Sequence, residues 1–314
     1  MNDAVYRSLP AAPVVERSVK TDVPSVLPLV CRWPDEMALK GYIIFCHGLG
    51  ASGRDYAELS IHWAAHGYLV IHPTFPDWID AVARAEPQLG LDPANDLTGW
   101  ADDPAARPRL YEILHTPSYW LERIRIVDQV MGALDAIFEA SCGRQPASIR
   151  GAIAGHSFGA YTSQLLAGAE FDLPGEGTRS FRDKRFAAAI LLSAQGRDQQ
   201  GLREGSWDGI DGPMLNVTGT RDGGAKGQDW HWKVEPYTFA PDGDKYLAVL
   251  TDADHYLGGI ARADQSPVPE QRNAIEDLTL AFLDAYLAGD VAAKAWLGNT
   301  ADMVGGCPLL FRRK

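Results

Sequence analysis

The stretch AIAGHSFGAYTSQ, residues 152–164, decides the fold class of this 314-residue chain. An apolar run ends at Gly155, Ser157 lies between Gly155 and Gly159, and small, helix-forming residues follow. This order predicts a buried strand, a sharp turn and a helix, with the serine at the turn. The two arms of such a turn come so close that a Cβ would clash, which explains glycine on both sides of the serine.

A serine at such a turn exposes its hydroxyl at the carboxyl end of the sheet and at the N-terminus of a helix. The helix end offers free N–H donors and a partial positive charge, which stabilise a developing oxyanion. The pattern G-x-S-x-G over residues 155–159 therefore makes Ser157 the candidate nucleophile. The five-residue pattern is weak alone, but the strand before it and the helix after it support this interpretation over a plain glycine-rich turn.

A serine nucleophile needs a base, and the base needs an orienting acid. With this turn, the chain order is serine, acid, histidine, each after a later strand. Asp222 follows the predicted strand PMLNVTG in the loop GTRDGG, and His255 follows the predicted strand KYLAVLT. We expect Asp222 and His255 to form a catalytic triad with Ser157.

Other side chains compete for these two roles. His231 is the alternative base. The alternatives for the acid are Asp198, Asp252 and Asp254, each of which is otherwise a solvated loop carboxylate.

An oxyanion hole takes two backbone N–H groups. One is expected from Phe158, directly after the nucleophile, and the other from Leu49 in the segment HGLGAS, which follows the apolar strand GYIIFC. A simple strand–helix turn is the alternative interpretation of HGLG. We expect the substrate to contact residues in this loop and in later loops, namely His47, Gly48, Trp78, Trp230, Trp232 and Tyr256.

Strands and helices alternate along the chain, which is typical of a parallel sheet with crossover helices. Eight strands are expected: two edge strands within residues 13–33, and six at 41–48, 68–73, 148–155, 186–192, 213–219 and 245–251. Helices are expected at 55–66, 158–169 and 270–288. Apolar residues spaced three and four apart from Trp120 to Phe138 predict one further amphipathic helix.

Residues 76–118 interrupt this alternation and are rich in Pro, Asp and Gly. We expect an irregular, lid-like insertion after the fourth strand, over the carboxyl end of the sheet. The insertion has eight acidic and three basic residues, so it should repel anionic substrates. Tryptophans here and after Asp222 favour an apolar or aromatic substrate pocket, although several could simply anchor long loops.

The composition limits the partners. A net charge of −12 without a basic cluster argues against nucleic acid. Four scattered cysteines give no disulfide framework and no zinc site, and no apolar run is long enough for a membrane span. The N-terminus lacks a basic segment followed by an apolar one, so we expect a cytoplasmic protein. The expected serine chemistry needs no metal and no organic cofactor. A homodimer is compatible with the sequence.

The segments FCHGLGASGRDYAELSIHWAAHGYLVIHP (residues 45–73) and AGHSFGAYTSQ resemble the α/β-hydrolase superfamily. More narrowly, they are similar to the platelet-activating-factor acetylhydrolases and the dienelactone-hydrolase-like group. The resemblance runs from about residue 40 to 260. It implies a single α/β-hydrolase domain over residues 1–314, with a mostly parallel, eight-stranded sheet flanked by helices.

The chain departs from both groups. Dienelactone hydrolases have a cysteine nucleophile, whereas this chain has Ser157. The acetylhydrolases have their acid after the strand that follows the nucleophile helix, and residues 191–196 there contain no carboxylate. The acid is therefore expected one strand later, at Asp222.

These observations predict a serine hydrolase for a neutral, small-to-medium, apolar or aromatic ester. Amide or peptide cleavage and acyl transfer by the same triad are alternatives. A ligand-binding relative without catalysis is a further alternative, although such a protein would be expected to have lost a triad residue.

Overall fold

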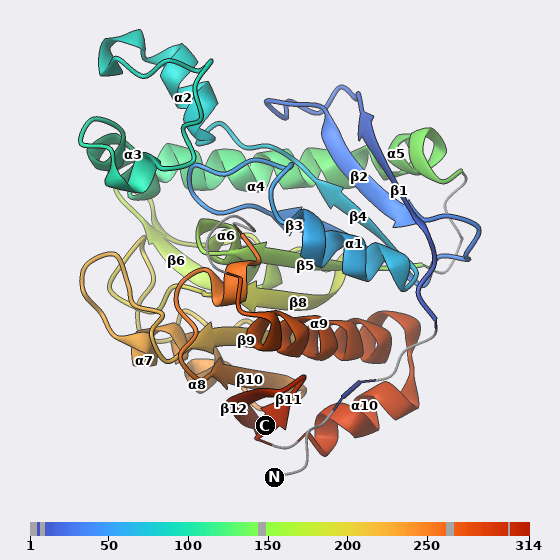
Figure 1. Cartoon of the computed structure of the whole chain (residues 1–314). Helices are drawn as coiled ribbons and strands as arrows, with labels where there is room; N and C mark the ends of the chain where they lie inside the picture. The colour runs from blue at the N-terminus through green and yellow to red at the C-terminus, as the bar shows by residue number, and fades with distance from the viewer. Residues whose placement is uncertain (1–4, 7–9, 144–148, 262–266, 301) are drawn as a thin grey trace.

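The computed structural model describes residues 5–6, 10–143, 149–261, 267–300 and 302–314, and its centre is a mixed sheet of ten strands (Figure 1). The order across the sheet is β1-β2-β4-β3-β5-β8-β9-β10-β12-β11. The pairings from β4 to β10 are parallel, and those at both edges are antiparallel. The strands are β1 (Val14–Val19), β2 (Leu29–Pro34), β3 (Gly41–Cys46), β4 (Tyr68–His72), β5 (Arg150–His156), β8 (Phe186–Leu192), β9 (Met214–Gly219), β10 (Lys245–Leu250), β11 (Met303–Val304) and β12 (Cys307–Arg313).

Helices cover both faces of the sheet (Figure 1). One face is covered by α1 (Ala57–Ala65) and α9 (Pro269–Leu283). The other face is covered by α4 (Pro117–Gly132), α5 (Leu134–Ser141) and α6 (Phe158–Ala167). In the part of the chain that the structure describes, no helix combines the length and apolarity that a membrane crossing requires.

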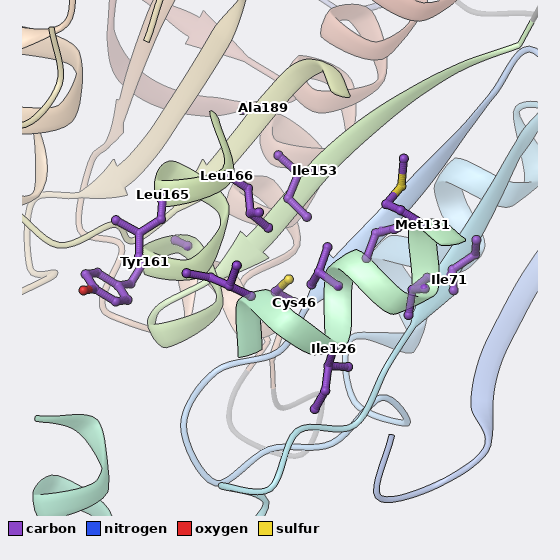
Figure 2. Packing of buried hydrophobic residues seen from close by; sticks show 14 of the residues in the cluster. Cys46, Ile71, Ile126, Met131, Ile153, Tyr161, Leu165, Leu166 and Ala189 are labelled. Carbon is purple, nitrogen blue, oxygen red and sulfur yellow. The ribbon is translucent and has the colours of Figure 1, made fainter. Parts of the chain in front are cut away.

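Alternation of side chains along each strand produces two hydrophobic layers. In β3, Ile43 and Phe45 pack under α1 and α9, whereas Tyr42, Ile44 and Cys46 pack under α4 to α6. Figure 2 shows the second layer, where side chains of α4 and α6 meet those of the central strands. Because both faces are buried, the central strands are continuous apolar runs rather than alternating ones.

The eight predicted strands are present, but the number eight is wrong. The short β11 and the strand β12, which pairs with β10, extend the sheet beyond the last predicted strand. Their sequences gave little signal, because β11 has two residues and Pro308 lies inside β12. A separate hairpin, β6 (Glu170–Leu173) and β7 (Gly177–Ser180), was also not predicted.

The predicted helix from Trp120 to Phe138 is two helices, because α4 ends at Gly132 and α5 begins at Leu134. Glycine has a low helix propensity, which explains a break at this point inside an apolar stripe that continues through both helices. The predicted helix at 270–288 is α9 followed by the π-helical turn η4 (Asp284–Ala288). The C-terminal helix α10 (Val291–Gly298) was not predicted.

The insertion at 76–118 is more regular than expected. It contains α2 (Ile79–Ala85) and α3 (Ala106–Leu114), with the single turns η1 (Pro87–Leu89) and η2 (Trp100–Asp102) between them. The two helices share a small hydrophobic core of their own, which explains their stability outside the main layers. Its buried residues are Ile79, Val82, Ala106, Leu110 and Ile113.

A buried ion pair fixes the start of this insertion to the rest of the molecule. Arg123 of α4 donates from Nε to Asp77 Oδ1 over 2.9 Å and from Nη2 to Asp77 Oδ2 over 2.6 Å. Both side chains are fully buried. A third bond runs from Arg123 Nη1 to the carbonyl oxygen of His47 over 2.9 Å. The guanidinium also lies 4.4 Å from the Phe75 ring centroid and 4.1 Å from that of Phe158.

We predict that Arg123→Met lowers the free energy of unfolding by about 3–5 kcal/mol, because it leaves the Asp77 carboxylate buried without its partner. The double variant Arg123→Met/Asp77→Leu should lose less, since it removes both charges. Urea denaturation measures both values. Arg125→Met, which removes an exposed arginine of the same helix, is the control and should have little effect. A double variant as unstable as the single one would contradict the explanation.

Candidate active site

Ser157 lies at the sharp turn between β5 and α6, as the sequence predicts. Its φ of 53° and ψ of −118° form a conformation that non-glycine residues rarely adopt. A Cβ on Gly155 would overlap the backbone of Gly159, and a Cβ on Gly159 would overlap the carbonyl of Cys46. The two glycines are therefore needed for the close approach of strand and helix.

The structure brings Ser157, His255 and Asp222 into one hydrogen-bonded line. His255 Nε2 is 3.0 Å from Ser157 Oγ, and His255 Nδ1 is 2.9 Å from Asp222 Oδ1. The three residues follow β5, β10 and β9, which end at the same edge of the sheet. The geometry is that of a nucleophile, a base and an orienting acid.

The alternative residues lie elsewhere. His231 is exposed, pairs with Asp229 and stacks on the Trp230 ring. The three alternative acids, Asp198, Asp252 and Asp254, are exposed, and Asp252 pairs with Arg221 on the surface.

The carboxylate of Asp222 is fully buried and has several partners. Thr218 Oγ1 donates to its Oδ2 over 2.8 Å, and Ser193 Oγ donates to its Oδ1 over 3.0 Å. Lys233 Nζ, also buried, lies 3.8 Å from Oδ1. Burial acts to raise the pKa of Asp222, but the Lys233 charge and the hydrogen bonds from His255 and Ser193 outweigh it and lower that pKa. The folded environment therefore favours the ionised carboxylate.

Sequence reasoning did not find Ser193 or Lys233. Ser193 follows β8 with a φ of 56°, and its Oγ lies 2.9 Å from His255 Nδ1 as well as close to Asp222. Lys233 Nζ donates to the Ser193 carbonyl over 3.2 Å. Ser193 lies within residues 191–196, the segment in which the resemblance led us to expect the acid of the acetylhydrolases. A polar residue directly after a central strand was the available signal for Ser193, whereas nothing in the sequence pattern indicated Lys233.

A chain of hydrogen bonds connects the loop of Gly48 to the loop of His255. The Gly48 N–H donates to Tyr56 Oη over 3.0 Å, and Tyr56 Oη lies 3.0 Å from His156 Nδ1. His156 Nε2 lies 2.7 Å from the carbonyl oxygen of His255. A carbonyl only accepts, so His156 donates from Nε2 and accepts from Tyr56 at Nδ1. Burial, together with the nearby His255, lowers the pKa of His156 to about 3, so this ring stays neutral.

The loop of Gly48 is fixed against the insertion. Gly50 donates to the Asp77 carbonyl over 3.2 Å, and Ile79 donates to the Gly50 carbonyl over 3.1 Å. Leu49 and Phe158 are the predicted oxyanion donors. Phe158 directly follows Ser157, and Leu49 lines the same cavity as Ser157. Within the described residues, neither backbone N–H donates to another protein group, so both are available to an oxyanion.

His47 was expected to contact substrate, but it is fully buried behind this loop. Its Nδ1 donates to the Gly48 carbonyl over 2.7 Å, and its Nε2 accepts from the Phe75 N–H over 2.9 Å. Burial and the nearby Arg123 lower the pKa of His47 to about 4. His47 therefore supports the loop of Gly48 through these hydrogen bonds and does not line the cavity.

A cavity of about 920 Å³ opens above Ser157 and His255. Of the residues expected to contact substrate, it is lined by Gly48, Trp78, Trp232 and Tyr256. Trp230 is not part of this lining, since its ring stacks on His231 instead. Residues of the insertion form much of the wall, including Trp100, one of the tryptophans on which the prediction of an aromatic pocket was based.

No known protein-family model matches the chain, and no curated protein matches its sequence.

We predict that the protein loses stability as the pH falls from 6.5 to about 4. Burial lowers the pKa values of His47 to about 4, of His156 to about 3 and of His72 well below the ordinary 6.5. In this range the unfolded chain binds protons at these histidines and the folded chain does not. Each histidine thus lowers the free energy of unfolding by about 1.4 kcal/mol per pH unit of the range.

Urea denaturation at pH 7, 6 and 5 measures this slope. The ring nitrogens of His72 have no hydrogen-bond partner among the described residues, so His72→Leu removes a titrating group without breaking a bond. His72→Leu should make the slope of the free energy of unfolding against pH shallower by about 1.4 kcal/mol per pH unit, which is the contribution of one proton. An unchanged slope would contradict the assignment.

The acid can be moved from Asp222 to a neighbouring position that also reaches His255. Asp222→Ala should lower kcat for an ester by about 10⁴-fold, the scale seen when the partner of a triad histidine is lost. Adding Ser193→Asp should restore part of the activity, because the Ser193 side chain already reaches His255 Nδ1. Adding Thr218→Asp instead is the matched control, since Thr218 contacts only the Asp222 side of the pair. Equal activity of the two double variants would contradict the geometry.

Proposed function

We propose that the chain is a serine hydrolase of the α/β-hydrolase fold that cleaves neutral carboxylic esters through an acyl-enzyme. The observation that carries the proposal is the line from Ser157 Oγ to His255 Nε2, at 3.0 Å, and from His255 Nδ1 to Asp222, at 2.9 Å. The strained serine conformation between two sterically required glycines supports it. So does the resemblance of residues 45–73 and of the serine turn.

In the proposed reaction, Ser157 Oγ attacks the acyl carbon while His255 Nε2 takes its proton. Asp222 fixes the tautomer of His255 and stabilises its charged form. The N–H groups of Leu49 and Phe158 bind the oxyanion, at about 3–4 kcal/mol of transition-state stabilisation each. His255 then protonates the leaving alcohol. In the second half of the reaction, His255 takes a proton from water, which attacks the acyl-enzyme. Ser157 then leaves, takes the proton from His255, and the carboxylic acid is released.

The neutral His156 supports this assignment of roles. It lies 5.0 Å from the His255 ring centroid, yet both its nitrogens are already engaged and its pKa is low. His255 is therefore the ring that accepts the serine proton. The hydrogen bond from His156 to the His255 carbonyl additionally positions the loop that carries the base.

The proposed substrate is neutral and of small to medium size. The cavity is lined by four acidic and three basic side chains, namely Asp55, Glu58, Asp80, Asp96, Arg54, Arg107 and Lys233, together with the aromatic residues named above. This mixture does not favour a strongly charged ligand. Cleavage of amides and transfer of the acyl group to an alcohol would use the same groups and stay as alternatives.

The proposal is tested with p-nitrophenyl esters from acetate to palmitate. Wild type should hydrolyse the short and medium esters, and Ser157→Ala should lower kcat by about 10⁴–10⁶-fold. Ser180→Ala, which changes an exposed serine of β7, is the matched control and should retain activity. A fluorophosphonate should add one covalent group to wild type and none to Ser157→Ala, as measured by intact mass.

Two results would overturn the proposal. One is an absence of hydrolysis and of labelling in wild type. The other is hydrolysis that is equal in wild type and Ser157→Ala. Activity on amides in place of esters would move the assignment to the amidase alternative.

A further inference from the structure

Three glutamines of one loop line the cavity above Ser157. Gln195, Gln199 and Gln200 follow β8, and each is at least 95% buried. Each has one buried amide atom without a hydrogen-bond partner among the described residues: Oε1 of Gln195, Nε2 of Gln199 and Oε1 of Gln200. None of these side chains takes part in the proposed reaction steps.

The loop holds these side chains in place through its backbone. The Gln195 carbonyl accepts from Gln164 Nε2 over 3.3 Å, and the Gln200 carbonyl accepts from Tyr161 Oη over 2.6 Å. Gln200 Nε2 donates to the Leu114 carbonyl over 3.1 Å, which fixes its Oε1 as the free atom. Of the three, only Gln200 thus uses its side chain to support the fold.

Such an arrangement is costly for stability alone. A buried polar atom without a partner loses about 1–3 kcal/mol relative to water, and here three such atoms belong to side chains of residues that line one cavity. Apolar side chains of similar size would fill the same space without that cost. Sites that bind small molecules, by contrast, combine an apolar and aromatic lining with a few placed polar groups that fix the ligand.

The chemistry of the amides indicates the ligand. An amide presents an acceptor at its oxygen and two donors at its nitrogen, and a hydroxyl or another amide pairs with either. A charged ligand would have to leave water, and these neutral amides provide no opposite charge to offset that cost. The aromatic residues Trp78, Trp100, Trp232 and Tyr256 supply apolar surface in the same cavity.

We propose that Gln195, Gln199 and Gln200 select an ester that carries a neutral hydroxyl or amide group near the bond that is cleaved. The inference rests on the proposed esterase function and makes it narrower, because a purely apolar ester would leave the glutamines unpaired. A site that hydrogen-bonds a substrate group discriminates strongly against the analogue that lacks it.

The experiment compares matched ester pairs. On the acyl side, p-nitrophenyl 3-hydroxybutyrate is compared with p-nitrophenyl butyrate, and the p-nitrophenyl ester of N-acetylglycine with p-nitrophenyl pentanoate. On the alcohol side, glyceryl monobutyrate is compared with propyl butyrate. We expect kcat/KM to favour the hydrogen-bonding ester by at least about tenfold in one pair. The pair that shows it distinguishes a hydroxyl from an amide and the acyl side from the alcohol side.

Gln195→Met and Gln199→Met remove the amides and nearly keep the side-chain volume. Each should lower the preference for the hydrogen-bonding ester, while the melting temperature stays constant or rises, because no hydrogen bond within the described residues is lost. Gln271→Met is the matched control. Gln271 is a buried glutamine of α9 whose Nε2 donates to the Thr251 carbonyl over 3.2 Å, so its loss should lower the melting temperature and leave the preference as in wild type.

The outcomes separate this inference from the proposed function. Hydrolysis of both members of every pair at equal rates would overturn the inference and keep the esterase. A lower melting temperature for Gln195→Met and Gln199→Met, with an unchanged preference, would show a structural role and also overturn it. No hydrolysis of any ester, with no fluorophosphonate labelling of Ser157, would overturn the proposed function and the inference together.

Discussion

The geometry of the candidate site depends on the contacts that the buried guanidinium of Arg123 makes. The guanidinium binds Asp77 at the start of the insertion and the carbonyl of His47 directly before Gly48, and it lies against the ring of Phe158 beside the serine. A buried charge tolerates the loss of a partner poorly, so these segments cannot move independently. The position of Leu49 and Gly50 therefore depends on helix α4, which carries Arg123.

The elements that could be predicted are those whose signal is local. Gly155 and Gly159 around Ser157 predicted a strand, a sharp turn and a helix, because a steric constraint operates over five residues. Asp222 and His255 were found since each follows a parallel strand, and the carboxyl ends of such strands meet at one edge of the sheet. The strand count was wrong at β12, where a proline and a polar end weaken the pattern.

The remaining site residues meet only in three dimensions. Arg123 lies on the buried face of an amphipathic helix, and this unusual place for a charge was the one available signal for it. Its partner Asp77 is 46 residues away, in an insertion that appeared irregular. His47 was assigned to the substrate because it ends a strand beside Gly48. Which side of the loop its ring takes depends on Phe75 and Arg123, whose positions the local sequence does not determine. The positions of the Tyr56 and His156 side chains likewise depend on partners that the local sequence does not determine.

The hydrogen-bond chain from Gly48 through Tyr56 and His156 to His255 also has a consequence for the order of folding. Its two long steps join residues that are 100 and 99 positions apart. During synthesis, the loop of Gly48 and the serine turn are made before β10 and His255. A nascent chain that ends before His255 therefore lacks the carbonyl partner of His156 Nε2. Under the proposed function, activity should arise only when β10, the last parallel strand, has joined the sheet.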